Sequence, residues 1–128
     1  MLFVVKLLTN LNFNVKITVN IKQERSYKMI AGSTPTHTFD LPFSTELISE
    51  LEIAYAQKDR IILHKYYEDC TLEGNAIITK LSQEDTFKFD EKNGNVCIQI
   101  RIKSKDGNVP ISDIIVVPLK QCLFDEAM

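Results

Sequence analysis

Apolar and polar residues alternate along residues 36–43, and a period of two predicts a β-strand with one buried face. The alternation places Phe39, Leu41 and Phe43 on the same face. Pro42 has no backbone N–H to donate to a strand ladder. The strand is therefore expected to lie at a sheet edge or to end near this proline.

Two further stretches alternate in the same way and are predicted to be strands. In residues 50–57 the inward residues are expected to be Leu51, Ile53 and Tyr55, with Glu50 and Glu52 outward. Residues 95–104 form the clearest strand, in which Val96, Ile98, Ile100 and Ile102 alternate with Cys97, Gln99, Arg101 and Lys103. The four aliphatic residues are expected to face the core.

Turn residues between these segments predict hairpins. Each expected turn joins two expected strands: Lys58-Asp59 joins residues 50–57 and 60–65, Glu73-Gly74-Asn75 joins 70–72 and 76–81, and residues 105–108 join 95–104 and 109–119. Gly74 can supply the positive φ that a tight turn requires. The final expected strand contains prolines at positions 110 and 118.

One short helical turn is expected after the fifth strand. Ser82 can cap the helix N-terminus, and Asp85 completes a capping-box arrangement with a shorter acid than usual. The turn is expected to run through Phe87, with Phe87 or Phe89 packed on the core. Residues 90–94 then form a polar turn.

These elements predict an all-β fold, an antiparallel immunoglobulin-like β-sandwich of about seven strands with one short helical turn. A chain of 128 residues has the length of a single domain. Residues 29–128 contain no internal repeat, low-complexity tract or linker and are expected to form this one domain. The tryptophan that accompanies the disulfide of many such sandwiches is missing.

Residues 1–28 differ from the rest of the chain and are expected to be an N-terminal extension. They hold five of the fifteen basic residues and one of the seventeen acidic ones, so residues 29–128 carry a net charge of −6. The extension contains two β-prone stretches, residues 2–8 and 13–21. Its apolar start is too short to span a bilayer, and it lacks the basic start and cleavage site of a signal peptide.

The codons before Met29 suggest that translation starts there. Glu24, Arg25 and Ser26 can be encoded GAA-AGG-AGC, which contains the bacterial ribosome-binding sequence AAGGAG at the appropriate distance. We therefore hypothesise that residues 1–28 are an over-extended gene start. The alternative is a genuine β-rich arm, and other codons at these three positions would contradict the hypothesis.

Composition argues against several partners. The hydrophobic fraction is 45%, the charged fraction 25% and the net charge −2, without a basic cluster. Phosphate-driven nucleic-acid binding needs a concentrated Lys/Arg face, so no nucleic-acid partner is expected, and no membrane partner either.

The three cysteines are far apart in the sequence and do not form the close pairs that zinc or redox sites use. Cys70, Cys97 and Cys122 are expected to be reduced and to act as small hydrophobic residues facing a core. A contact of Cys70 with Cys122 or with Cys97 stays open.

Candidate catalytic and binding residues are few. His37 and His64 lie on different expected strands and are interpreted as exposed or cross-strand histidines, because tetrahedral metal sites need three or four converging ligands. The acid pairs Glu68-Asp69, Glu84-Asp85, Asp90-Glu91 and Asp125-Glu126 all fall at expected turns or ends. No catalytic, metal or cofactor site is predicted, no cofactor is expected, and the protein is expected not to be an enzyme.

Two tyrosines suggest a contact surface. Tyr55 continues the inward stripe of its strand and is expected in the core. Tyr66 and Tyr67 end a strand, so at least one ring should be exposed.

Four short strings resemble a known group of sequences: residues 32–39, residues 54–57, residues 69–72 and residues 81–87. The chain is similar over most of residues 29–128 to short uncharacterised proteins encoded in phages and prophages of Gram-positive gut bacteria. The resemblance implies a start near Met29 and a phage gene cluster as the setting, and it supplies no active-site residues. Together with the missing signal peptide, it leads us to expect a virion or the bacterial cytoplasm as the location.

The expected function is therefore that of a non-enzymatic phage structural or accessory protein, acting through protein–protein contacts as a tail, baseplate or head-decoration component. Exposed edge strands could pair with a neighbouring subunit, and a homo-oligomer is expected to be possible. The alternative is a small regulatory or host-interaction protein that binds one cellular target. A weaker alternative is a hydrolase whose site assembles from distant residues, such as Cys70 and His64.

Overall fold

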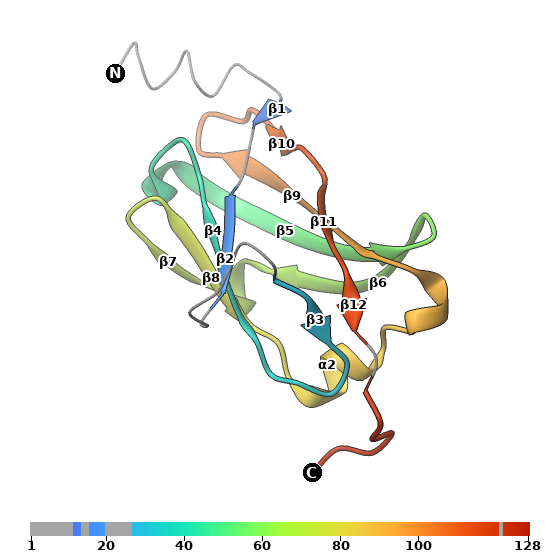
Figure 1. Cartoon of the computed structure of the whole chain (residues 1–128). Helices are drawn as coiled ribbons and strands as arrows, with labels where there is room; N and C mark the ends of the chain where they lie inside the picture. Colours follow the sequence, from blue (N-terminus) through green and yellow to red (C-terminus); the bar gives the residue numbers. More distant parts are fainter. Residues whose placement is uncertain (1–11, 14–15, 20–26, 121) are drawn as a thin grey trace.

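The alternating apolar residues pack between two β-sheets in the computed structural model of the chain (Figure 1). The structure describes residues 12–13, 16–19, 27–120 and 122–128, so the β-prone stretch 2–8 lies outside the described residues. The fold is mainly β with antiparallel sheets, which confirms the predicted all-β sandwich.

The six-stranded sheet has the order β1-β10-β9-β5-β6, and β11 also pairs with β9. Its strands are β1 (Asn12–Phe13), β5 (Ile48–Gln57), β6 (Arg60–Tyr66), β9 (Val96–Ser104), β10 (Ile111–Ser112) and β11 (Ile115–Val117). The long strands β5 and β9 are antiparallel neighbours at the centre, with Ile53 opposite Ile100. The short strand β1 joins β10 in parallel.

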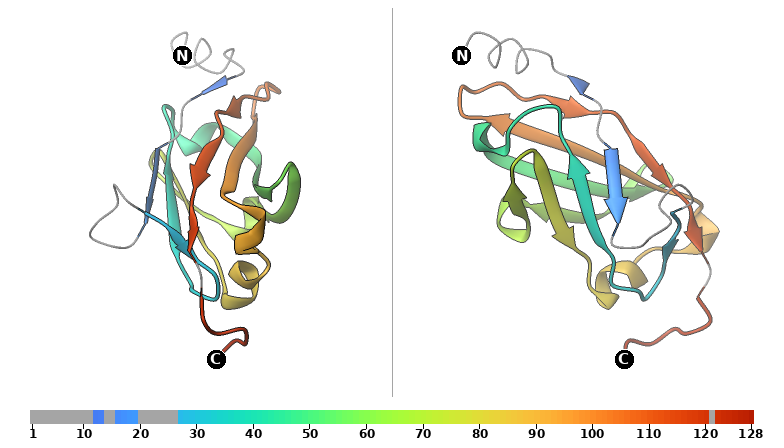
Figure 2. Two further views of the ribbon diagram at one scale, coloured as in Figure 1. Left: turned by 45° about the vertical axis from the view of Figure 1, so that its right-hand side comes forward. Right: turned by 60° about the vertical axis from the view of Figure 1, so that its left-hand side comes forward.

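The four-stranded sheet has the order β2-β4-β8-β7 and is antiparallel throughout. Its strands are β2 (Lys16–Val19), β4 (Thr36–Asp40), β7 (Thr71–Glu73) and β8 (Ala76–Lys80). A separate parallel pair joins β3 (Met29–Ile30) to β12 (Leu119–Lys120). Figure 2 shows the two sheets as layers seen from the side.

The predicted helical turn is present as α2 (Gln83–Phe87), and its capping box is confirmed. The Ser82 hydroxyl accepts from the N–H of Asp85 at 3.0 Å, and the Asp85 carboxylate accepts from the N–H of Ser82 at 2.9 Å. Three 3-10 turns complete the described helical elements: η2 (Thr45–Leu47), η3 (Tyr67–Asp69) and η4 (Glu91–Asn93). The helix lies at one end of the sandwich, near β3 (Figure 1).

The predicted core residues are buried. Every inward residue expected on the three alternating strands is fully or almost fully buried: Phe39, Leu41, Phe43, Leu51, Ile53, Tyr55, Val96, Ile98, Ile100 and Ile102. Beyond α2, Phe89 joins the core. The predicted hairpin turn at Lys58 and Asp59 is also confirmed, because both residues have positive φ, as primed hairpin turns require.

The prediction of one continuous last strand over residues 109–119 is wrong. That segment is divided into β10, β11 and β12. Pro110 and Pro118 have no N–H for a ladder. Between them, the Ser112 hydroxyl accepts from the N–H of Ile100 at 2.9 Å, a bond that a backbone carbonyl makes in a regular ladder. After Pro118 the chain leaves β9 and pairs with β3 instead.

Part of the predicted N-terminal extension packs on the sandwich. The ring of Phe13 is buried and meets Phe43 edge to face, with ring centroids 5.4 Å apart. Strand β2 pairs with β4, and the Tyr27 hydroxyl lies 2.9 Å from Nε2 of His37. The start of translation at Met29 stays a prediction.

Gln57, at the end of β5, holds the turn between α2 and β9. Its side chain is buried, and Nε2 donates to the carbonyls of Asp90 and Gly94, both at 2.9 Å. Its Oε1 accepts from the N–H of Asp90 at 3.0 Å. The amide therefore uses both its donors and its acceptor to position η4, which is what a buried polar side chain needs.

Gly32 cannot carry a side chain without displacing its neighbour. Its φ is +84°, and a Cβ would lie 2.5 Å from the Phe87 ring. Gly32→Ala is expected to lower the free energy of unfolding by about 2 kcal/mol, from the left-handed backbone and the clash together. Urea unfolding measures the loss. Gly74→Ala is the control, since its φ is +59° but nothing lies within 4 Å, and an equal loss in both variants would contradict the clash.

Candidate protein-interaction surface

Exposed apolar side chains gather on the outer face of the six-stranded sheet. Among the described residues, six large apolar side chains at least 37% exposed lie there: Ile61, Tyr66, Val109, Ile111, Ile114 and Val116. The residues behind them on the inner face form the core. Large apolar patches on a protein surface mark contact sites more often than chance exposure does.

The strand registers bring these side chains together. Val116 of β11 lies opposite Cys97 of β9, and Ile61 of β6 lies opposite Ala56 of β5. Because the intervening outward residues are small, a hollow of about 180 Å³ opens over Ala54, Ala56 and Cys97. Lys58, Asp59 and Gln99 also line this hollow. We call its apolar lining residues, together with the neighbouring exposed Ile111 and Val116, the apolar face: Ala54, Ala56, Ile61, Cys97, Ile111, Ile114 and Val116.

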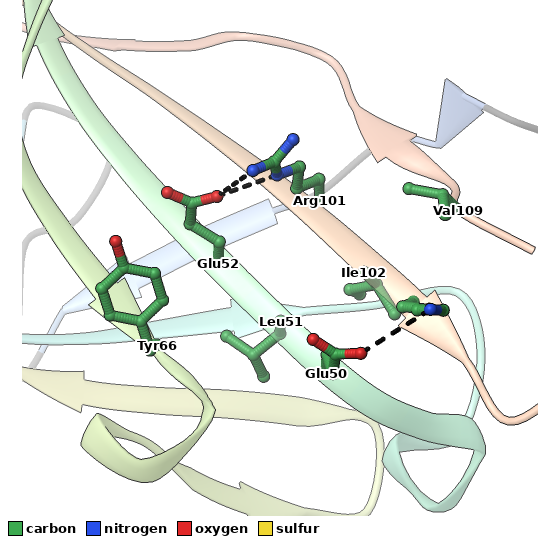
Figure 3. Close-up of a pocket in the computed structure, with 8 residues that line it drawn as sticks. Glu50, Leu51, Glu52, Tyr66, Arg101, Ile102 and Val109 are labelled. Atoms are coloured by element: carbon green, nitrogen blue, oxygen red, sulfur yellow. Dashed lines mark hydrogen bonds and ion pairs between the residues drawn. The ribbon is translucent and has the colours of Figure 1, made fainter. Parts of the chain in front are cut away.

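The other end of the same outer face is charged. Glu52 of β5 accepts from Nε of Arg101 at 2.8 Å and lies 2.6 Å from a terminal guanidinium nitrogen of the same residue (Figure 3). Nδ1 of His64 lies 2.5 Å from the other Glu52 oxygen. Lys103 lies 3.8 Å from Glu50. These contacts join β5 to both of its neighbours.

The contacts with Arg101 and His64 determine the pKa of the Glu52 carboxyl. Partial burial raises its pKa, but the hydrogen bonds from Arg101 and His64 and their charges outweigh burial, so the pKa lies below its usual value. The His64 ring also stacks on Tyr66, with ring centroids 5.8 Å apart and an angle of 3°. Because both oxygens of Glu52 are occupied, this cluster cross-links three strands.

The charged side chains that line the hollows of this outer face balance one another. Three acidic and three basic residues line its hollows: Glu50, Glu52, Asp59, Lys58, Arg101 and Lys103. Residues 29–128 carry a net charge of −6 in total. The acidic excess therefore lies on the remaining surface.

The outer face of the four-stranded sheet differs in composition. Thr36, Thr38 and Asp40 of β4 and Lys80 of β8 lie partly or fully exposed there, beside the partly exposed Ala76 and Ile78 of β8. Polar residues of this kind are typical of a solvated sheet face. The apolar face is thus a feature of one sheet only among the described strands.

His37 is not exposed, and of the two alternatives that the sequence left it is the cross-strand one, since it lies opposite Thr79 of β8. Its imidazole is fully buried between two tyrosines, with Nε2 2.9 Å from the Tyr27 hydroxyl and Nδ1 2.8 Å from the Tyr55 hydroxyl. Burial lowers the pKa of His37 to about 4 and raises that of Tyr27 to about 12. His64, by contrast, is exposed, as interpreted.

The cysteines are free, and only one of them packs against the core cluster. Cys70 does so, and burial raises its pKa. The expectation that Cys97 faces a core is wrong, because it lies on the apolar face. Cys122 is partly buried in the C-terminal segment.

The acid pairs and the tyrosines lie where the sequence predicts them. The four acid pairs lie in η3, α2, η4 with its cap, and the C-terminal segment, all turns or ends as predicted. Tyr55 is buried, and both Tyr66 and Tyr67 are exposed. Within the part of the chain that the structure describes, no group of three His, Cys, Asp or Glu residues is placed to hold a metal.

Two comparisons with known proteins found no match. No protein-family model matches the chain, and a search of curated proteins finds no significant match. Over the described residues, the structure has no helix with the length and apolar character needed to cross a bilayer. The fold is that of a β-sandwich protein with exposed apolar side chains on the outer face of one sheet.

Proposed function

We propose that this chain is a non-enzymatic phage structural or accessory protein that acts through protein–protein contacts, as a tail, baseplate or head-decoration component. The observation that supports this proposal best is the apolar face. Its centre, Ala54, Ala56 and Cys97, lies on the two long central strands β5 and β9, and Ile114 comes from the connection between β10 and β11. A surface centred on strands holds its side chains in defined positions, which suits a part that must fit a neighbour in an assembly.

The order of the strands supports the immunoglobulin-like class of sandwich. In that class one sheet has the order A-B-E-D and the other contains C, F and G. The order β2-β4-β8-β7 corresponds to the first, and β5, β9 and β10 correspond to the second. Strand β6 adds a neighbour to β5, as the variable type does. The class is shared by many binding and structural proteins, so it does not by itself assign a function.

The phage setting rests on the resemblance of residues 29–128 to small phage and prophage proteins. Such gene clusters encode many small domains that are virion parts or adaptors. The apolar face agrees with either role. The alternative function, a small regulatory or host-interaction protein that binds one cellular target, would use the same face for a different partner.

Mass spectrometry of purified particles tests the proposed function. Particles are purified on a density gradient from a culture that carries the gene after prophage induction. Peptides of this chain are expected to be enriched in the particle fraction relative to the soluble lysate. A soluble cytosolic protein expressed in the same culture serves as the contamination control.

The opposite distribution would favour the alternative. If the chain stays in the soluble lysate and the particle fraction contains no more of it than of the control protein, the virion role is wrong. The N-terminal peptide observed in the same experiment also tests the start at Met29. A peptide from residues 1–28 would contradict that start.

A further inference from the structure

We propose that the edge of β4 that faces away from β8 is a binding site for an extended peptide segment, and that the chain's own N-terminal residues occupy it as a detachable ligand. The residues of this ligand that the structure describes are 12–13, 16–19 and 27. We call this edge of β4, with His37 near one end and Phe43 beyond the other, the strand site. It belongs to the four-stranded sheet, so the inference goes beyond the proposed function, which is supported by the other sheet.

Backbone pairing fills the length of the strand site. Among the described strands, β2 pairs with β4 alone, over four residue pairs from Lys16 opposite Asp40 to Val19 opposite His37 (Figure 1). Without β2, the N–H and C=O groups along this edge of β4 would lack strand partners. An edge of this kind is what an extended peptide pairs with when it binds by β-strand addition.

A buried aromatic ring anchors one end of the segment. Phe13 is only 9% exposed, and its ring meets that of Phe43 edge to face. The backbone is held there too, because the carbonyl of Phe13 accepts from the N–H of Asp113 at 2.8 Å. Next along the segment, Ile17 lies opposite Phe39 and packs against the core cluster. This end of the strand site therefore fits an apolar aromatic side chain.

A hydrogen bond anchors the other end. The Tyr55 hydroxyl is fully buried, and Nδ1 of His37, at 2.8 Å, is its hydrogen-bond partner among the described residues. A buried hydroxyl with one polar neighbour donates to it, because otherwise its own proton would be unpaired. Nδ1 is therefore the acceptor nitrogen, and Nε2 carries the proton that it donates to the Tyr27 hydroxyl oxygen at 2.9 Å. This end of the strand site thus fits a ring that carries an acceptor oxygen.

The sandwich keeps its core when the segment leaves. Among the residues that the structure describes, Phe13 is the one buried member of the core cluster that precedes Met29. Residues 1–28 hold five basic residues and one acidic residue, a net charge of +4, against −6 for residues 29–128. Opposite charges attract the segment to the strand site without adding to the core. A few anchors on a core that is otherwise complete are typical of a bound peptide.

Cutting the full chain after it has folded tests this inference. The recognition sequence of a site-specific protease is inserted between Tyr27 and Lys28, which lie outside the strands, so that every residue of the chain is kept. After cleavage, a fluorescent peptide of residues 10–27 is added in excess and its anisotropy is measured. We expect the peptide to replace the cut segment and bind. It is expected not to bind the uncut protein, in which the attached segment has a far higher effective concentration.

Three variant peptides separate recognition of the two anchors from attraction by charge. Phe13→Ala removes the buried ring and is expected to weaken binding about ten-fold or more. Tyr27→Phe keeps the ring and removes the acceptor oxygen, so it is expected to weaken binding several-fold. A scrambled peptide of the same composition and charge is expected not to bind.

The other outcomes contradict the inference. If circular dichroism shows that the protein unfolds when the segment is displaced, the segment is part of the fold and not a ligand. If the peptide fails to displace the cut segment, the segment is not detachable. Equal binding of the scrambled peptide would mean that charge alone attracts it, and equal binding of the Tyr27→Phe peptide would refute the role of the His37 N–H. None of these results bears on the virion role, which the analysis of particles tests separately.

Discussion

Replacing Ile100 by alanine is expected to lower the free energy of unfolding by about 2–5 kcal/mol, the cost of truncating a buried aliphatic side chain. Ile100 is fully buried at the centre of β9, directly opposite Ile53 of β5. The substitution removes apolar contacts and leaves a cavity that two paired strands cannot easily close. Urea unfolding at pH 7 measures the difference from the parent protein.

Lys103→Ala is the matched control on the same strand. Its side chain is 54% exposed, and its contact with Glu50 is a surface ion pair at 3.8 Å. Such pairs contribute about 0–1 kcal/mol, so the control is expected to change stability little. A loss below about 1 kcal/mol for Ile100→Ala would mean that β9 does not pack in the core as described.

The strands that the sequence predicts well are those with one buried face and one solvated face. In β5 and β9 the alternation is long, and every inward residue it assigns is buried. The same holds for the turn at Lys58 and Asp59 and for the capping box of Ser82 with Asp85, because local chemistry alone determines them.

The final strand illustrates what local patterning leaves out. Residues 109–119 are rich in β-branched residues, and this predicts a strand. The breaks in the strand depend on partners that are distant in sequence. The Ser112 hydroxyl, and not a backbone carbonyl, accepts the hydrogen bond from the N–H of Ile100, and Leu119 pairs with Met29 of β3. The preference of a residue for extended backbone does not determine which strand its segment will pair with.

Two buried polar residues were missed although the pattern contained them. In a strand, residues two apart point to the same face, so His37 shares a face with Phe39 and Leu41, and Gln57 with Tyr55 and Ile53. The alternation therefore indicates burial for both. Polarity argued for exposure, and only the structure shows the partners that make burial tolerable, namely two tyrosines for His37 and the η4 turn for Gln57.

The apolar face could be predicted only in part. Alternation along β5 and β9 points Ala54 and Cys97 outward, although Cys97 was expected to face a core as a small hydrophobic residue, and the two form a hollow only together with Ile61 and Ile114. Those two residues come from a hairpin partner and from the broken last strand, and their positions depend on the register. The sequence therefore indicated the exposed tyrosines as a contact surface but not the apolar face.

The Tyr27–His37–Tyr55 contacts connect the two sheets through a polar chain inside an apolar core. Tyr55 belongs to β5 and His37 to β4, and the rings of these two residues stack with centroids 5.7 Å apart. A neutral imidazole has one N–H donor and one acceptor nitrogen, so one tyrosine donates to it and the other accepts from it. A protonated imidazole has two donors, and the donating tyrosine would have to turn its hydroxyl away.

The burial of His37 between the two tyrosines is expected to make the protein less stable as pH falls from about 7 to about 4. Burial lowers the pKa of His37 in the folded state to about 4, from 6.5 in an unperturbed histidine. Between these two values the unfolded state binds more protons, so stability rises with pH. The contribution is complete above pH 6.5 and is lost as pH falls towards the folded pKa. Each unit of pKa difference corresponds to about 1.4 kcal/mol, which makes the full loss about 3 kcal/mol.

Urea unfolding at pH 7 and pH 5 isolates the effect of His37, because most carboxylates titrate below this range. The parent protein is expected to lose about 2 kcal/mol of unfolding free energy between these pH values. His37→Gln removes the titrating group and keeps a donor and an acceptor, so it is expected to be less stable at pH 7 and to lose much less on acidification. His64→Gln retains His37 and is expected to show the loss of the parent. Equal losses in the parent and in His37→Gln would mean that His37 is not buried in neutral form between the two tyrosines.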